Sequence, residues 1–126
     1  MTFQTICLLG ILTSLPFGAA FLLMPDATPA MYEISGWNPG TTTIARLFGV
    51  ELLYMTGALI AVRGTTDPAV QRRFATMFCL GSLVATVLLV QAAVSGAVGP
   101  MMWSSVALYG FFAIAWGWIA RRRAAD

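Results

Sequence analysis

The chain contains no histidine and no lysine, since all seven of its basic residues are arginines. Without histidine there is no imidazole ligand for haem, zinc or copper, and no Ser-His pair for nucleophilic catalysis. Without lysine there is neither a Schiff base with a carbonyl substrate nor the phosphate-binding lysine of a P-loop. Carboxylates, arginines, hydroxyls, amides and two cysteines remain. We therefore expect no metal site and no cofactor.

Charge is also scarce. Only 10% of the 126 residues are charged, whereas soluble domains carry about 25%. Hydrophobic residues make up 59% of the chain and the mean hydropathy is +0.82. This balance predicts a single polytopic membrane domain whose main partner is the lipid bilayer. The net charge of +2 is too small to indicate nucleic-acid binding.

Four apolar stretches approach the roughly 20 residues that cross a bilayer. We predict an all-α, integral membrane four-helix bundle with helices over 5–24, 43–62, 68–97 and 101–120. Asp67 and Pro68 form a favourable N-cap and first turn for the third helix. The long loop 25–42 is expected to hold a short helix starting at Thr28-Pro29 and a turn at Asn38-Pro39-Gly40.

The arginines predict the orientation of the bundle. Arg63, Arg72 and Arg73 flank the second connection, and Arg121–Arg123 follow the last helix, while the other two connections have no basic residue. By the positive-inside rule, the second connection and both termini are cytoplasmic. Small residues four apart predict the packing faces of the first three helices: Gly10, Ser14 and Gly18, then Gly57 and Ala61, then Gly81 and Ala85.

Glu51 lies near the middle of the second predicted span. A carboxylate at that depth costs about 2.5–3.5 kcal/mol on insertion scales, so its presence needs a reason. Tyr54 and Ala58 share its helical face, and small Ala58 and Ala61 indicate that this side turns toward other helices. Arg46 lies about 140° around the helix from Glu51, so a direct ion pair between them would be strained.

Polar groups on all four predicted helices fall in the outer half of the bilayer. At 1.5 Å per residue, Glu51 lies roughly 13 Å deep, Tyr109 about 12 Å and Gln91 about 9 Å. We predict an outward-facing pocket in which Glu51 and Tyr109 are the catalytic residues. The residues expected to contact a lipophilic substrate are Thr13, Ser14, Arg46, Tyr54, Gln91, Trp103 and Ser105.

Three functions stay open on this evidence. The preferred hypothesis is a cofactor-independent membrane enzyme in which Glu51 acts as general acid or base for isomerisation, cyclisation or epoxide opening. A second is a structural or assembly subunit, in which Glu51 binds a neighbouring chain in a homo-oligomer or larger membrane complex. A third is a small proton-coupled transporter, although few polar residues in the inner half offer a path through it.

The chain also resembles the DoxX-like group of small four-helix bacterial membrane proteins. A first helix ends in Phe21-Leu-Leu-Met-Pro-Asp26, and the second carries Ala45-Arg-Leu-Phe-Gly-Val-Glu51 before Gly57. The resemblance implies a compact multi-pass fold in the bacterial inner membrane, with links to quinone or redox partners in some members. Arg46 and Gly49 are the positions that match.

Overall fold

Residues 1–125 fold into five α-helices in a computed structural model. The structure describes residues 1–125, with side chains as far as Arg122. The helices are α1 (Phe3–Leu23), α2 (Ala27–Tyr32), α3 (Pro39–Arg63), α4 (Pro68–Val94) and α5 (Met102–Ala125). All except α2 are long and apolar enough to cross a membrane. The predicted all-helical fold with four candidate spans is therefore confirmed.

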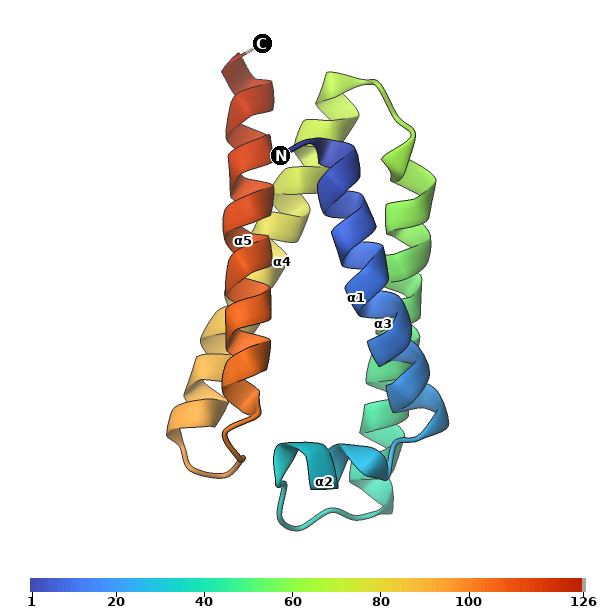
Figure 1. Cartoon of the computed structure of the whole chain (residues 1–126), viewed down its shortest axis with the longest axis vertical. Coiled ribbons are helices and arrows are strands. Elements are labelled where there is room, and N and C mark those ends of the chain that lie inside the picture. Colours follow the sequence, from blue (N-terminus) through green and yellow to red (C-terminus); the bar gives the residue numbers. More distant parts are fainter. Residues whose placement is uncertain (126) are drawn as a thin grey trace.

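The four long helices form two hairpins that lean together like an inverted V (Figure 1). One hairpin packs α1 against α3, and the other packs α4 against α5. The hairpins meet at the end that holds both termini and separate toward the other end, where α2 lies across the opening. We call these the arginine end and the α2 end. The arginine end carries Arg63, Arg72, Arg73, Arg121 and Arg122.

Local capping chemistry explains where α3 and α4 begin. The Asn38 side chain accepts hydrogen bonds from the backbone amides of Gly40 and Thr41. The Thr41 hydroxyl in turn accepts a hydrogen bond from the Asn38 amide, which completes a capping box. The predicted turn at Asn38-Pro39-Gly40 is therefore wrong, since these residues open the helix four positions earlier than expected. Asp67 caps α4 as predicted, accepting from the Ala69 amide at 2.8 Å.

The first hairpin is held by small residues on α1. Gly10 faces Leu59, and Gly18 faces the backbone of Gly49. Between them, the hydroxyls of Ser14 and Thr56 lie 2.6 Å apart in a buried hydrogen bond. The predicted packing face on α1 is thus found, with α3 as its partner. Close backbone approach of this kind is typical of helix pairs in membranes, where lipid supplies no hydrophobic drive between helices.

Of the residues predicted to form packing faces on α3 and α4, only Ala85 is even half-buried. Gly57 and Ala61 on α3 are exposed, as is Gly81 on α4, and a Cβ added at Gly57 or Gly81 would meet nothing within 4 Å. Helix α3 instead turns Ala45, Gly49, Leu52, Thr56 and Leu59 inward. Spacing alone did not reveal which small residues face a neighbour, since both sides of α3 carry them.

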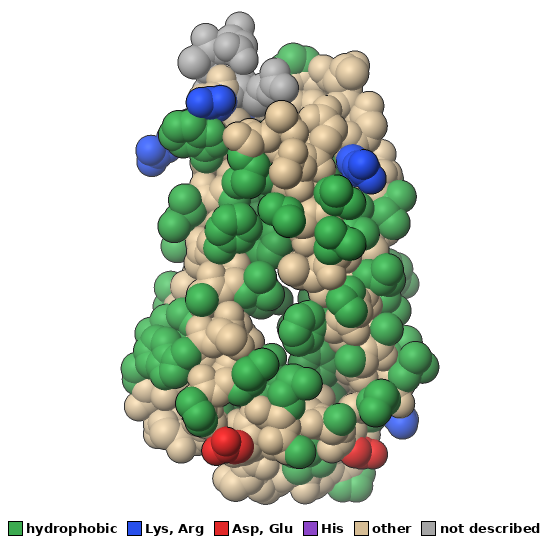
Figure 2. Space-filling view, in the orientation of Figure 1, with side chains coloured by type: hydrophobic (Ala, Val, Ile, Leu, Met, Phe, Trp, Pro, Cys, Tyr) green, Lys and Arg blue, Asp and Glu red, His purple; other side chains and the backbone are tan. Residues whose placement is uncertain are grey.

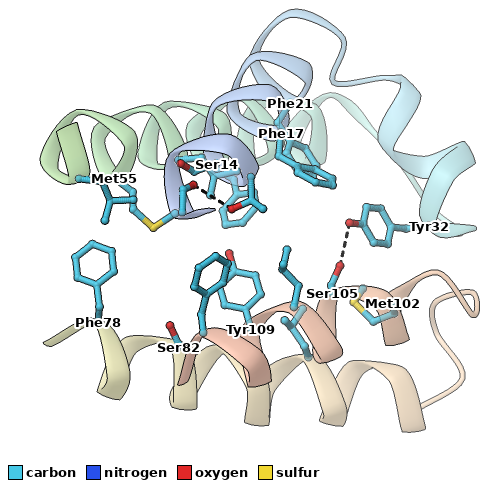
Figure 3. A pocket seen from close by; sticks show the side chains of 18 of the residues that line it. Ser14, Phe17, Phe21, Tyr32, Met55, Phe78, Ser82, Met102, Ser105 and Tyr109 are labelled. Atoms are coloured by element: carbon cyan, nitrogen blue, oxygen red, sulfur yellow. Dashed lines mark hydrogen bonds between the residues drawn. The ribbon is translucent and has the colours of Figure 1, made fainter. Parts of the chain in front are cut away.

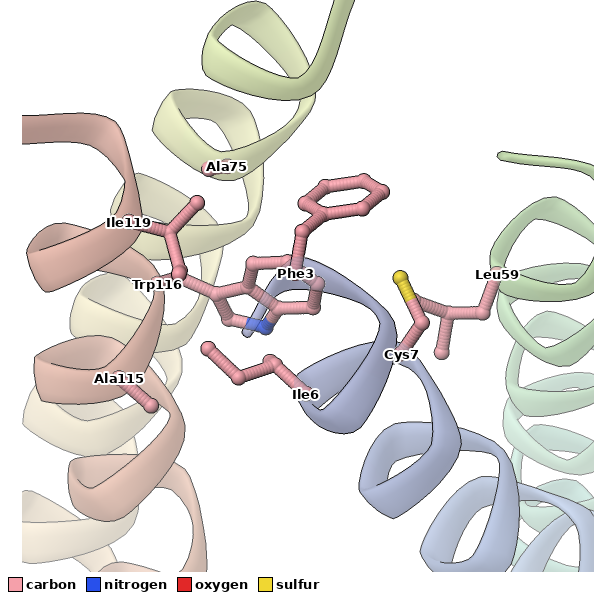
Figure 4. Packing of buried hydrophobic residues seen from close by; sticks show 8 residues of the cluster. All are labelled: Phe3, Ile6, Cys7, Leu59, Ala75, Ala115, Trp116 and Ile119. Atoms are coloured by element: carbon pink, nitrogen blue, oxygen red, sulfur yellow. The ribbon is translucent and has the colours of Figure 1, made fainter. Parts of the chain in front are cut away.

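A buried cluster joins the two hairpins at the arginine end (Figure 4). Phe3 from the start of α1 makes edge-on contacts with Phe74, at a centroid distance of 6.2 Å, and with Trp116, at 5.9 Å. Ile6 and Cys7 pack in the same cluster, and both are fully buried. The Cys7 side chain is a free thiol.

Charged side chains divide between the two ends (Figure 2). On the face shown, positive side chains gather mainly near the arginine end and negative ones near the α2 end. Arg122 lies over the ring of Trp118, 4.5 Å from its centroid, a cation–π arrangement suited to an interfacial aromatic belt. The side chain of Arg123, counted with the predicted cytoplasmic arginines, lies outside the described residues.

The closest approach of α1 and α3 yields a stability prediction. Gly49→Ala would place a methyl group 2.7 Å from the Leu22 amide nitrogen and 2.8 Å from the Gly18 carbonyl oxygen. Backbone cannot move aside cheaply, so we expect a loss of about 1–3 kcal/mol in unfolding free energy. Gly57→Ala, on the open side of the same helix, is the matched control and should not destabilise. Unfolding in detergent, followed by circular dichroism, separates the two variants.

Candidate functional site: a cavity between the two hairpins

The space between the hairpins contains a cavity of about 240 Å³. Its walls come from both hairpins and from α2 (Figure 3). Phe17 and Phe21 of α1 stand on one side, and Tyr109 and Ser105 of α5 on the other. Eight of its 21 lining residues are aromatic: Phe17, Phe21, Tyr32, Phe48, Phe78, Tyr109, Phe112 and Trp116. The cavity is therefore an apolar chamber with a few hydroxyl groups.

Helix α2 closes the cavity at the open end of the V. The Tyr32 side chain is buried, and its hydroxyl lies 3.1 Å from that of Ser105 on α5. The Gly99 amide donates to the Tyr32 carbonyl at 2.8 Å, so backbone and side chain of one residue hold the second hairpin. The expected short helix in the first connection is thus present, beginning at Ala27, and it bridges the hairpins.

The hydroxyls that line the cavity fall into two groups. Thr13 donates to the carbonyls of Leu9 and Gly10 within its own helix, and Ser14 is paired with Thr56. Thr28, Ser82 and Tyr109 also line the cavity, but among the described residues none of these three hydroxyls makes a hydrogen bond. The hydroxyls without a hydrogen bond are therefore free to bind a polar atom in the chamber.

The structure brings together only part of the predicted site. Thr13, Ser14, Ser105 and Tyr109 all line the cavity. The other predicted site residues do not line it, and all are exposed in the single chain: Arg46, Glu51, Tyr54, Gln91 and Trp103. The predicted grouping of Glu51 with Tyr109 in one pocket is therefore not found.

The packing of Gly49 explains the position of Glu51. Gly49 is pressed against α1, and two residues further along a helix is a turn of about 200°. Glu51 consequently leaves the opposite side of α3 from the face that meets α1. Phe48 and Met55, one helical turn to either side of Glu51, reach the cavity wall. Glu51 lies beyond that wall, on the outward face.

Several lining residues carried no functional signal in the sequence. Tyr32 was only one of several aromatics in a long loop, and Phe17, Phe48 and Phe78 were indistinguishable from lipid-facing residues. The placement of Tyr32 on a short helix after Pro29 was the available clue. Nothing local indicated that this helix would lie across the bundle and bury the phenol.

Comparisons with protein-family models, curated proteins and solved structures found no match to this chain. The resemblance to the DoxX-like group therefore stays a prediction from the residues that carry it. In the structure, Gly49 has a packing role against α1, and Arg46 is exposed near the α2 end beside Asp26 and Trp37.

The closure by α2 can be tested through the Gly99 amide. Tyr32→Phe removes the hydroxyl that meets Ser105, and a hydrogen bond of this kind contributes about 1 kcal/mol. We expect exchange of the Gly99 amide with deuterium to accelerate by about threefold to tenfold as α2 detaches more often. Tyr54→Phe alters an exposed phenol on α3 and should leave this exchange unchanged. Equal rates in both variants would contradict a closing role for Tyr32.

Proposed function

We propose that this protein is a multi-pass membrane protein that binds a lipophilic small molecule in the cavity between its hairpins. The observation that carries the proposal is an apolar chamber lined by aromatic side chains from both hairpins, with unengaged hydroxyls at Tyr109 and Ser82. Ligand sites typically combine an apolar lining with a few polar groups that fix orientation. A cavity of about 150 Å³ already holds benzene in another protein, and this one is larger.

Charge distribution supports an orientation for the site. Arginines cluster at the end where the hairpins meet, which by the positive-inside rule faces the cytoplasm. The α2 end then faces outward, and the wider part of the V lies in the outer half of the membrane. Figure 2 shows the surface hollowed between the hairpins at mid-height. A lipophile would enter sideways through this gap from the lipid, without crossing water.

The lining favours binding over acid–base turnover. Its described residues include no carboxylate and no guanidinium, and its polar side-chain groups are the hydroxyls of serine, threonine and tyrosine and the indole N–H of Trp116. A phenol or alcohol can orient a carbonyl or hydroxyl of the ligand by hydrogen bonding. Isomerisation, cyclisation or epoxide opening by Glu51 would require that side chain to reach a ligand from outside the cavity wall. We therefore propose binding as the primary function.

Cavity filling tests the binding site. Ser82→Phe would place a phenyl ring in the chamber, so the bound lipophile should be lost. Native mass spectrometry of the protein, extracted in mild detergent, should show added mass on the wild type and none on Ser82→Phe. Thr76→Phe is the matched control, since Thr76 is exposed on the same helix and does not line the cavity. The same added mass on both variants would refute the site.

The role of Glu51 can be separated from that of the cavity. Because Glu51 does not line the chamber, Glu51→Gln should retain the bound lipophile, whereas Tyr109→Phe should weaken its retention. A hydrogen bond lost from a bound ligand costs about 0.5–1.5 kcal/mol, or roughly twofold to tenfold in affinity. Competition with a fluorescent lipophile in detergent measures the affinity of both variants, Glu51→Gln and Tyr109→Phe. Loss of binding in Glu51→Gln would restore the acid–base hypothesis.

A further inference from the structure

Glu51 belongs to a row of exposed residues along the outward face of α3. The row contains Ile44, Leu47, Glu51, Tyr54, Ala58 and Ala61, and every member is exposed in the single chain. Their spacing alternates between three and four residues, so they form one straight seam of the kind seen in parallel helix pairs. We call these six residues the α3 seam. Among the described residues, no hydrogen bond is recorded for the side chains of Glu51 or Tyr54.

An exposed row on α4 shows what a lipid-facing surface looks like in this chain. Its members at comparable positions along the helix are Met77, Leu80, Val84 and Val87, all exposed and all of substantial apolar bulk. Ile44 and Leu47 of the α3 seam are exposed and apolar in the same way, but its other four residues differ. It has a carboxyl group in the middle, a phenol that is 71% exposed, and two alanines in place of larger side chains.

We propose that the α3 seam is the contact through which a second copy of this chain binds, with the two α3 helices parallel. Copies inserted in one membrane share the same orientation, so a two-fold axis along the membrane normal places each seam residue near its own counterpart. Glu51 then faces the partner's Glu51. In the seam pattern this central position is where one polar residue fixes register and oligomeric state.

The seam offers matching donors and acceptors to a copy of itself. In each copy the Tyr54 hydroxyl can donate a hydrogen bond, and the carboxyl oxygens of the partner's Glu51 can accept it. Tyr54 is one turn from Glu51 on the same side, which brings it within reach of the partner's Glu51. Ala58 and Ala61, which follow Glu51 and Tyr54 toward the arginine end of α3, let the two helices approach closely. A second copy of the chain therefore supplies hydrogen-bond partners for Glu51 and Tyr54, which lipid tails cannot supply.

This contact is independent of the cavity. Gly49 fixes one face of α3 against α1, and the α3 seam lies on the other face. None of the six seam residues lines the cavity, although its lining residues Phe48 and Met55 lie one helical turn to either side of Glu51. Failure of dimerisation would thus leave the lipophile-binding proposal untouched, and failure of ligand binding would leave the dimer intact.

Cysteine cross-linking in native membranes tests the seam. Ala58→Cys and Ala61→Cys are made in the full chain with Cys7 and Cys79 changed to alanine, and a mild oxidant is added. We expect a disulfide-linked dimer from both. Ile60→Cys is the control on α3, since it is exposed but about 160° around the helix from Ala58. Val84→Cys is the control on the lipid-facing row of α4, and neither control should cross-link efficiently.

The role of Glu51 is measured separately in the protein with its native cysteines. Förster transfer between labelled copies in lipid vesicles gives the dimerisation constant. Glu51→Gln, which can still donate and accept, should dimerise like the wild type. Glu51→Leu should weaken association by about threefold to fifteenfold, the range expected for membrane hydrogen bonds.

Three outcomes would overturn the proposal. One is equal cross-linking at positions 58, 60 and 84, which would indicate random collisions. Another is a wild-type protein that stays monomeric in vesicles at high protein density. The third is a stoichiometric partner of different sequence that co-purifies with the wild type and is released by Glu51→Leu.

Discussion

The edge-on contact of Phe3 with Phe74 and Trp116 is the constraint on which the rest of the structure depends. It lies at the arginine end, where the two hairpins meet in a buried cluster. At the α2 end the tie is polar, from Tyr32 to Ser105 and from Gly99 to the Tyr32 carbonyl. Two ties at opposite ends leave the middle of the bundle unfilled, and the cavity is the space between them.

The spans were predictable because length and apolar composition suffice to identify helices of membrane length. Their ends were predictable wherever capping residues act, as Asp67 does for α4, but Asn38 and Pro39 admitted both a turn and a helix start. Counting along each helix also predicted that polar residues of different helices lie at a similar level. Thr13, Ser14, Ser105 and Tyr109 accordingly do share one chamber.

The rotation of each helix about its own axis was not predictable. In a soluble helix the polar stripe reveals the outward face, but a membrane helix is apolar on both faces, and α3 carries small residues all round. The packing of Gly49 against α1 fixes the rotation of α3. Nothing in the sequence near Gly49 distinguished it from Gly57, which faces no neighbour. A wrongly predicted rotation places a side chain inside the chamber when it lies outside. For Glu51 this changes the hypothesis from a catalytic residue to a residue at an interface.

The rotation of α3 places Glu51 outside the chamber, although the sequence predicted that it acts inside it. An ionised carboxylate in an apolar chamber would impose a large desolvation cost on a neutral lipophile site, and the hydroxyls proposed to orient a ligand, at Tyr109 and Ser82, would avoid that cost. On the outward face, the carboxyl group of Glu51 would be costly in lipid as long as a copy stays alone. In the proposed dimer that cost would favour association, and the proposed chamber would remain free for an uncharged molecule.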